Sequence, residues 1–479
     1  MGTIKQSVAT FGVNRALKYL SKDPEKNIPK VMEMVDQFCP DDLFVAQRYA
    51  FRHAIETKNN WYQLLLHGVR DIDPGVRDNF FSSFLVNANL IGWPEQERNR
   101  EKYGCNIPWA ILLDPTSACN LHCTGCWAAE YGNRLNLTRD DIESIIKQGE
   151  ALGCYFYIYT GGEPLVRKHD LMDICAAHPE ATFMSFTNGT LIDEAFCQDM
   201  LRVKNFVPVL SVEGSAETTD ARRGTGTYAR VTHAMELLRE HRLIFGISAC
   251  VTRENESTIA SEAYFQQMID WGALFCWFFM FMPVGVDAAP ELVPTPEQRE
   301  HQIRFVREMR SKMPLFTMDF WGDSEYVGGC IAGGRRYLHI NAAGDVDPCV
   351  FAHYSNANIH TSTLLEALQS PLFMAYHDNQ PFNDNLMRPC PIIDNPPKLA
   401  EMVKASGAHS TDLQAPEDAG DLCAKCAPIS LAWKPVSEGL WDSFQRASAE
   451  ARAKRDAELA GKAAADDVDE VEDRTAASA

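Results

Sequence analysis

Short apolar runs alternate with amphipathic stretches from about residue 106 to residue 320. Residues 138–153 and 231–242 repeat apolar side chains at the three- and four-residue spacing of a helix that packs along one face. The apolar runs have the length of buried strands, and turn-forming residues follow them. Strand and helix therefore alternate six times, which predicts an α/β fold, a partial (β/α)6 barrel with its active site at the carboxyl ends of the strands. The predicted strands lie within residues 109–115, 154–162, 182–189, 206–214, 245–252 and 274–285.

Residues 1–105 have the pattern of an all-helical N-terminal domain. A serine cap opens residues 21–38, and apolar side chains then recur at helical spacing. The beginning of this domain mixes apolar and basic residues, so it could lie on a membrane surface, although packing against a core is the interpretation that we favour. The apolar residues of that segment are Phe11, Leu17, Tyr19 and Leu20.

Beyond residue 320 the alternation stops, and Gly, Pro and Cys become frequent. This composition predicts a loop-rich, cysteine-containing domain over residues 321–445. From residue 446 the chain is rich in alanine and then acidic, a composition that buries too little apolar surface to offset chain entropy. We therefore predict that residues 446–479 form an acidic tail, a solvated helix that gives way to disorder.

The composition narrows the classes of function. A formal charge of −20 over 479 residues argues against a nucleic-acid-binding protein, which needs basic residues to neutralise phosphates. No secretory signal pattern opens the chain, and the most apolar run, residues 271–286, is shorter than the roughly 20 residues of a membrane span. We therefore expect a cytoplasmic protein without a transmembrane segment. In a reducing compartment the 15 cysteines are better explained by metal ligation and buried thiols than by disulfides.

Three cysteines, Cys119, Cys123 and Cys126, follow the first predicted strand within eight residues. The surrounding Asp, Pro, Ser and Asn residues favour a loop, which can wrap three sulfurs around one metal centre. A structural zinc needs four protein ligands, and the nearby candidate is His122, directly beside Cys123. A catalytic zinc uses three ligands, but three thiolates without a His or a carboxylate are atypical. A four-iron, four-sulfur cube held by three cysteines leaves one iron free to bind a substrate or cofactor.

This C-x3-C-x2-C spacing resembles the signature of the radical S-adenosylmethionine (SAM) superfamily. In that family the open iron chelates SAM, and an electron from the reduced cluster cleaves SAM to a 5′-deoxyadenosyl radical. The resemblance covers residues 109 to about 285 and implies a [4Fe-4S] cluster at Cys119, Cys123 and Cys126.

Further motifs at the ends of the predicted strands resemble the SAM-binding motifs of the same family. Arg222 competes with Arg223 for contact with the methionyl part of SAM. The residue before the third cysteine is usually aromatic in the family and is Gly125 here, so the resemblance assigns aromatic packing near the adenine to Trp127 or His122. The implied SAM-binding residues are Gly161, Gly162, Glu163, Ser185, Thr187, Asn188, Ser211, Glu213, Arg223 and Val284.

The later cysteines resemble the SPASM and twitch extensions, which follow radical SAM barrels and hold auxiliary iron–sulfur clusters. Two such clusters usually need seven cysteines, so the five present here imply one auxiliary [4Fe-4S] cluster. Four of the five could complete its ligand set, or fewer could bind it and leave one iron open. A zinc knuckle is the alternative. In sulfatase-maturing members an acid follows the cysteine that corresponds to Cys349, but Val350 stands here, so formylglycine formation is not expected. The predicted ligands are Cys330, Cys349, Cys390, Cys423 and Cys426.

The resemblance implies an enzyme that cleaves SAM reductively and abstracts hydrogen from an unreactive C–H bond, most commonly to modify a peptide or protein. A lipid or isoprenoid substrate is the second possibility. A non-catalytic iron–sulfur electron carrier or zinc scaffold is the alternative from another class. The implied partners are SAM, a one-electron reductant such as flavodoxin or ferredoxin, and the substrate. The sequence assigns no catalytic acid or base.

Overall fold

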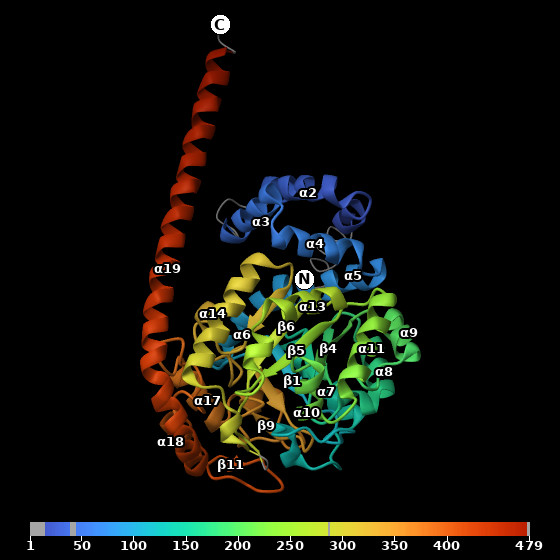
Figure 1. The fold of residues 1–479 in the computed structure, drawn as a ribbon, viewed down its shortest axis with the longest axis vertical. Helices are drawn as coiled ribbons and strands as arrows, with labels where there is room; N and C mark the ends of the chain where they lie inside the picture. Colours follow the sequence, from blue (N-terminus) through green and yellow to red (C-terminus); the bar gives the residue numbers. More distant parts are fainter. Residues whose placement is uncertain (1–14, 39–44, 286–287, 477–479) are drawn as a thin grey trace.

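The computed structural model describes residues 15–38, 45–285 and 288–476, and a nine-stranded sheet forms its centre (Figure 1). All six predicted strands are present and lie next to one another in chain order, paired in parallel. Their bounds are β1 Ala110–Leu113, β2 Phe156–Tyr159, β3 Thr182–Thr187, β4 Phe206–Ser211, β5 Gly246–Val251 and β6 Phe275–Met280.

Two further parallel strands extend this sheet at its ends. Strand β7 (Phe316–Asp319) pairs with β6, and β8 (Tyr337–Ile340) pairs with β1. Strand β9 (Val346–Asp347) then adds to β8 in antiparallel direction. The first part of the cysteine-rich region is therefore joined by backbone hydrogen bonds to the edge of the sheet where the three-cysteine loop begins.

Alternate strand residues face opposite sides of the sheet, as the period of two requires. On one side Ile111 and Tyr157 pack with the buried residues of the connecting helices. On the other side Leu112, Phe156 and Ile158 pack with aromatic residues and with the C-terminal domain. The connecting segments are η2 Trp127–Tyr131, α7 Arg139–Ala151, η3 Pro164–Arg167, α8 Lys168–Ala177, α9 Glu194–Val203, α10 Ala216–Arg223, α11 Thr227–Glu240, α12 Glu256–Ile259, α13 Glu262–Trp271, η4 Pro290–Leu292, α14 Pro296–Lys312 and α15 Ser324–Val327.

In the N-terminal region the described residues, 15–38 and 45–105, form helices and no strand, as predicted. Leu17 is buried, and a small core joins Ile28, Tyr62 and Leu66, which supports core packing for this part of the first segment; Phe11 lies outside the described residues. The elements are α2 Pro24–Phe38, α3 Val45–Thr57, α4 Asn60–Arg70, α5 Pro74–Phe80, the π-helix η1 Phe81–Ile91 and α6 Gly92–Tyr103.

The C-terminal region combines short elements with one long helix, α19 (Ala419–Ala476), which runs along one side of the molecule and projects beyond it (Figure 1). This helix continues through the segment that the composition predicted to become disordered, in keeping with the high helix propensity of alanine. Its buried Trp433 and Leu440 pack with Ile303 of α14 and with Met387. The other elements are β10 Tyr354–Ser355, α16 Leu364–Leu368, α17 Pro371–Asn379, α18 Pro396–Ser406 and β11 His409–Ser410.

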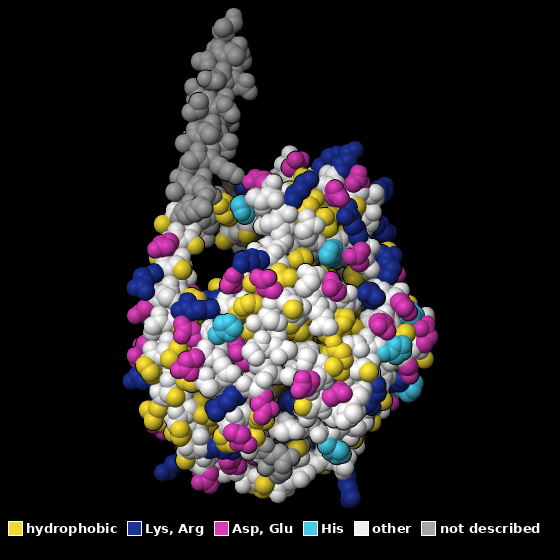
Figure 2. All heavy atoms as spheres, viewed as in Figure 1, with side chains coloured by type: hydrophobic (Ala, Val, Ile, Leu, Met, Phe, Trp, Pro, Cys, Tyr) yellow, Lys and Arg dark blue, Asp and Glu magenta, His cyan; other side chains and the backbone are white. Residues whose placement is uncertain are grey.

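Acidic, basic and hydrophobic side chains are interspersed over the face of the globular body that Figure 2 shows. Within the described part of the chain, no helix combines the length and the apolar composition that a membrane span requires.

Candidate active site

The three-cysteine loop follows β1 and lies at the carboxyl edge of the sheet. Cys119 is exposed, Cys123 and Cys126 are partly buried, and all three line one cavity of about 230 Å³, which we call the loop cavity. The amide of Thr124 donates to the Arg222 carbonyl (2.9 Å), so the middle of the loop is fixed to the end of α10. The structure therefore brings together the three sulfurs that the sequence singled out.

The donors around these sulfurs suit an anionic iron–sulfur cube. The amide of Leu121 donates to Cys119 Sγ (3.4 Å), and Arg223 Nη1 lies 3.9 Å from Cys123 Sγ. Across the described ranges, no three His, Cys, Asp or Glu side chains meet closely enough to bind a single metal ion. A cube differs from a single ion because each thiolate binds an iron of its own.

The glycine pair after β2 packs directly against the cysteine loop. Gly162 donates its amide to the Thr116 carbonyl (3.0 Å), and a Cβ at Gly162 would overlap the Ala118 carbonyl. Gly161 has φ +99°, and a Cβ there would lie 2.7 Å from Asp114 Cβ. Both positions need glycine because the two loops touch through their backbones.

Glu163 connects the glycine loop to the end of β3. Its side chain is buried and accepts hydrogen bonds from Thr187 Oγ1 (2.6 Å), the Asn188 amide (2.8 Å) and the Leu165 amide (3.0 Å). Burial raises the pKa of Glu163, and these donors act in the opposite direction. Three of about four acceptor positions on the carboxylate are thus used inside the protein, so the side chain fixes the loop.

Glu213 forms a second buried anionic centre and does not line the loop cavity. It accepts from Arg222 Nη1 (2.6 Å), Arg223 Nε (2.7 Å) and the Cys250 amide (2.9 Å). Burial acts to raise the pKa of Glu213, but the two guanidinium groups outweigh it and hold the pKa below its ordinary value. Because both arginines also line the cavity, Glu213 fixes their positions toward the cysteines.

The predicted SAM-binding residues divide into two groups in the structure. Ser185, Glu213 and Val284 are buried outside the wall of the loop cavity. The residues that do line it are Gly161, Gly162, Glu163, Thr187, Asn188, Ser211 and Arg223, together with Arg222.

The sequence interpretation missed the aromatic wall of the loop cavity. A Cβ on Gly125 would lie 2.5 Å from two ring carbons of Phe281, so Phe281 packs where the family's usual aromatic residue would begin. Of this wall the sequence had named Trp127, which lines the cavity and makes edge-on contacts with His339 and Phe351, whereas His122 is exposed. Trp277, Phe279 and Met280 of β6 line the cavity, and Phe281 and Met282 follow at the end of the strand. The aromatic run of β6 was the available signal. The aromatic lining residues are Trp109, Trp127, Phe186, Trp277, Phe279, Phe281, Phe320, Tyr337 and Phe351.

A second cavity of about 590 Å³, which we call the auxiliary cavity, adjoins the first. Trp109, Trp277 and Tyr337 line both. Cys330, Cys349 and Cys390 line the auxiliary cavity, whereas Cys423 and Cys426 lie on α19 and line neither.

The two aspartates near Cys349 are engaged elsewhere, and Val350 lines the loop cavity. Asp345 accepts from Asn358 Nδ2 (2.9 Å), and Asp347 pairs with the buried His339 (3.3 Å). His339 also pairs with Asp114 at the end of β1 (3.0 Å). This buried network joins the barrel to the C-terminal domain, and neither Asp345 nor Asp347 lines a cavity.

Comparison with known proteins supplies the family context. The model of the radical SAM superfamily matches residues 113–262, and that of the SPASM iron–sulfur cluster-binding domain matches residues 330–391. The chain is 26% identical over 290 residues to an AdoMet-dependent heme synthase of Methanosarcina barkeri, covering 54% of this chain and 82% of that protein. It is 30% identical over 178 residues to a cysteine-type anaerobic sulfatase-maturating enzyme of Clostridium perfringens, covering 33% of this chain and 48%, about half, of the relative. The fold is similar to that of Streptococcus suis SuiB bound to the precursor peptide SuiA, with a TM-score of 0.52, 16% identity and coverage of 68% and 87%.

Proposed function

We propose that this chain, which carries a radical SAM domain and a SPASM domain, generates a 5′-deoxyadenosyl radical and abstracts hydrogen from a C–H bond of a peptide or protein. It is an enzyme whose cofactors are a [4Fe-4S] cluster with SAM and an auxiliary iron–sulfur cluster. The observation that carries the proposal is the loop cavity, in which Cys119, Cys123 and Cys126 share one wall with Ser211 and the glycine pair. When bound there, the reduced cluster supplies the electron that cleaves SAM.

In this proposal the protein's own groups orient SAM. Ser211 and Asn188 offer hydrogen-bonding groups at the cavity wall, and Arg222 and Arg223 offer positive charge. The two arginines are fixed by Glu213, so they present a preorganised site for the SAM carboxylate. Glu163 has the supporting role of fixing the glycine loop.

The aromatic wall would protect the radical. Trp277 and Phe279 from β6 and Phe186 from β3 contact one another with ring centroids 5.5–5.8 Å apart. Such packing excludes water and leaves an apolar space in which a substrate C–H bond can approach the radical. A peptide substrate agrees with the names of the sulfatase-maturating relative and of the SuiB–SuiA complex.

Anaerobic turnover tests the radical chemistry. Reconstituted protein with dithionite should convert SAM to 5′-deoxyadenosine and methionine, measured by chromatography. Cys123→Ala should abolish the conversion, and Cys105→Ala, which alters a buried core thiol, should retain it. Robust cleavage by Cys123→Ala would remove the three-cysteine loop from the mechanism.

A second candidate is an apolar, non-peptide substrate such as a lipid or a tetrapyrrole. The apolar and aromatic lining of both cavities favours it, as does the heme synthase relative, which is matched over most of its length. Turnover with a fully deuterated cell extract that has been separated into peptide and lipid fractions distinguishes a peptide from an apolar substrate. The fraction that transfers deuterium to 5′-deoxyadenosine contains the substrate.

A further inference from the structure

Three of the five C-terminal cysteines line the auxiliary cavity. Cys330, Cys349 and Cys390 line it together, and each of the other two thiols is close enough for its charge to act on Cys390. Tyr337 forms a hydrogen bond with Cys349 Sγ (2.8 Å) through its hydroxyl. These thiols come from the loop before β8, the segment after β9 and the loop after α17, so the tertiary fold gathers them.

The sulfurs of this set receive backbone hydrogen bonds. The amide of Phe351 donates to Cys349 Sγ and the amide of Ile392 donates to Cys390 Sγ, each at 3.4 Å. The amide of Leu121 makes the same contact, two residues on, with Cys119 in the SAM-cluster loop. Backbone donors of this kind stabilise thiolates and tune the potential of a cluster.

A tyrosine hydroxyl beside the three thiols lacks a partner. Tyr376 is fully buried, lines the auxiliary cavity, and its hydroxyl makes no hydrogen bond in the structure. Cys330, Cys349 and Cys390 all lie near enough for their charges to act on it. An unpaired buried hydroxyl is destabilising, and a cluster sulfide or thiolate would be an acceptor for it.

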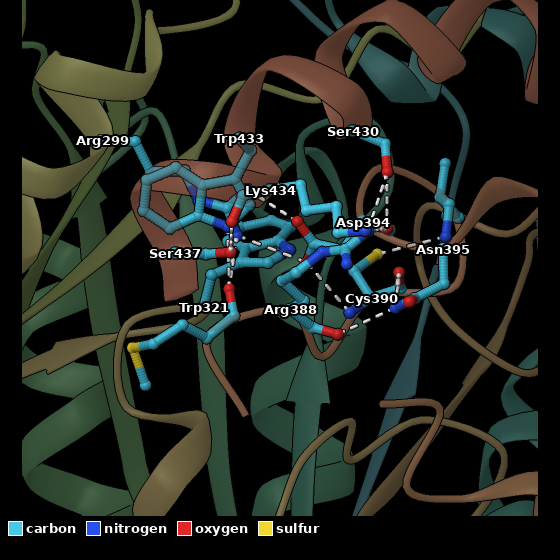
Figure 3. A network of polar contacts seen from close by, with 12 residues as sticks. Arg299, Trp321, Arg388, Cys390, Asp394, Asn395, Ser430, Trp433, Lys434 and Ser437 are labelled. Carbon is cyan, nitrogen blue, oxygen red and sulfur yellow. Dashed lines mark hydrogen bonds and ion pairs between the residues drawn. The ribbon is translucent and has the colours of Figure 1, made fainter. Parts of the chain in front are cut away.

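The Cys390 loop is already fixed by a buried polar network (Figure 3). Asp394 accepts from the Cys390 amide (3.1 Å) through one oxygen and from Arg299 Nη1 (2.7 Å) through the other. The carbonyl of Asp394 accepts from Arg388 Nη2 (2.8 Å) and from Ser430 Oγ (2.6 Å). Both carboxylate oxygens are thus engaged, so Asp394 positions Cys390 rather than acting as an iron ligand.

Cys423 and Cys426 have a different environment. Cys423 is buried, and its thiol donates to the Pro396 carbonyl (2.6 Å), which requires the proton that a ligand would lose. Cys426 is fully buried in the packing of α19. The SPASM match, residues 330–391, also ends before both.

We propose that, among the cysteines that the structure describes, Cys330, Cys349 and Cys390 are the ligands of the auxiliary [4Fe-4S] cluster, that Tyr376 donates a hydrogen bond to it, and that Cys423 and Cys426 are structural thiols. Three cysteines leave one iron of the cube without a thiolate. This ligand set does not depend on SAM cleavage, so its failure would leave the proposed function standing.

Iron and sulfide analysis tests the ligand set in a full-length Cys119→Ala, Cys123→Ala, Cys126→Ala background, which removes the first cluster. This parent should bind about four irons per chain after reconstitution. Adding Cys423→Ala with Cys426→Ala should leave that number unchanged, and adding Cys390→Ala should abolish it. The proposal is overturned if the Cys423/Cys426 variant loses its iron while its circular dichroism matches the parent, or if the Cys390 variant keeps a four-iron Mössbauer spectrum.

Two measurements on the intact auxiliary cluster test its open iron and the Tyr376 contact. In the same Cys119→Ala, Cys123→Ala, Cys126→Ala background, mild oxidation should release one iron and give the electron paramagnetic resonance signal of a three-iron cluster. A cube that resists oxidation has a complete protein ligand set. Tyr376→Phe should lower the midpoint potential because one hydrogen bond to the cluster is lost. Tyr354→Phe, whose hydroxyl donates to the Glu417 carbonyl, is the matched control and should leave the potential unchanged. Equal potentials for the two variants would exclude the Tyr376 contact.

Discussion

Replacing Glu213 by glutamine should destabilise the barrel strongly. The change keeps the shape of the side chain but removes the charge that Arg222 and Arg223 share. The carboxylate is fully buried, and the two arginine side chains are only 15% and 12% exposed. Two buried guanidinium groups would therefore remain without their counter-charge.

The size of the effect follows from this burial. Breaking a buried ion pair by removing one partner costs about 3–5 kcal/mol. At about 2–4 °C per kcal/mol for a domain of this size, the Tm should fall by on the order of 10 °C. Differential scanning calorimetry of reconstituted protein measures the change in Tm. The matched control is Glu217→Gln, which alters an exposed carboxylate on α10, the helix that carries Arg222 and Arg223.

The dependence on pH gives a second test. The pKa of Glu213 in the folded protein lies below its ordinary value. The stability that its charge contributes is therefore fully present above the unfolded pKa of about 4.3 and is lost as the pH falls through the folded pKa. The Tm difference between wild type and Glu213→Gln should therefore stay constant from pH 6 to 8 and narrow only in more acidic solution. A Tm for Glu213→Gln no lower than that of the Glu217→Gln control would refute the reasoning.

Three further changes test other parts of the structure. Gly125→Ala places a side chain on a left-handed backbone (φ +64°), which costs about 1–2 kcal/mol, and sets its Cβ 2.5 Å from Phe281, which costs about 1–3 kcal/mol. The affinity for SAM, measured by equilibrium dialysis, should therefore fall at least about tenfold. Adding Phe281→Ala to the same chain should restore part of that affinity. Trp433→Ala removes a buried ring at a cost of about 3–5 kcal/mol, so limited proteolysis should cut α19 faster; an unchanged rate would contradict its packing role. Burial opposes the charged form of His339, but two aspartates outweigh it and raise its pKa from 6.5 to about 9. The stability it contributes is present below pH 6.5 and is lost as the pH rises toward 9, so the wild-type Tm should decline over that range and His339→Gln should show a flatter profile.

The strands and the cysteine loop were predictable because their signals are local. Six apolar runs of strand length, each followed by a turn, specify six βα units before any contact is known. The spacing of Cys119, Cys123 and Cys126 places three sulfurs on one short loop whatever the rest of the chain does. The glycine pair was also visible, although its closest partner proved to be the cysteine loop itself.

Side-chain partners far apart in sequence could not be predicted in this way. From the sequence, Glu163 and Glu213 were both predicted to contact SAM, but in the fold the carboxylates of both accept hydrogen bonds from groups of the protein itself. Strand β8 could not be recognised as the neighbour of β1, because more than 200 residues separate them and only the closing of the sheet brings them together.

The C-terminal cysteines show both what the sequence predicts and what it cannot. The sequence by itself determined that five thiols follow the barrel, and their order indicated an auxiliary cluster. Only the tertiary structure divided them, because Cys330, Cys349 and Cys390 lie on loops that converge on one cavity, whereas Cys423 and Cys426 lie on α19 and do not line that cavity. The physical reason is that a metal-binding set is defined by positions in space, and residue spacing fixes those positions only within a single loop or helix turn.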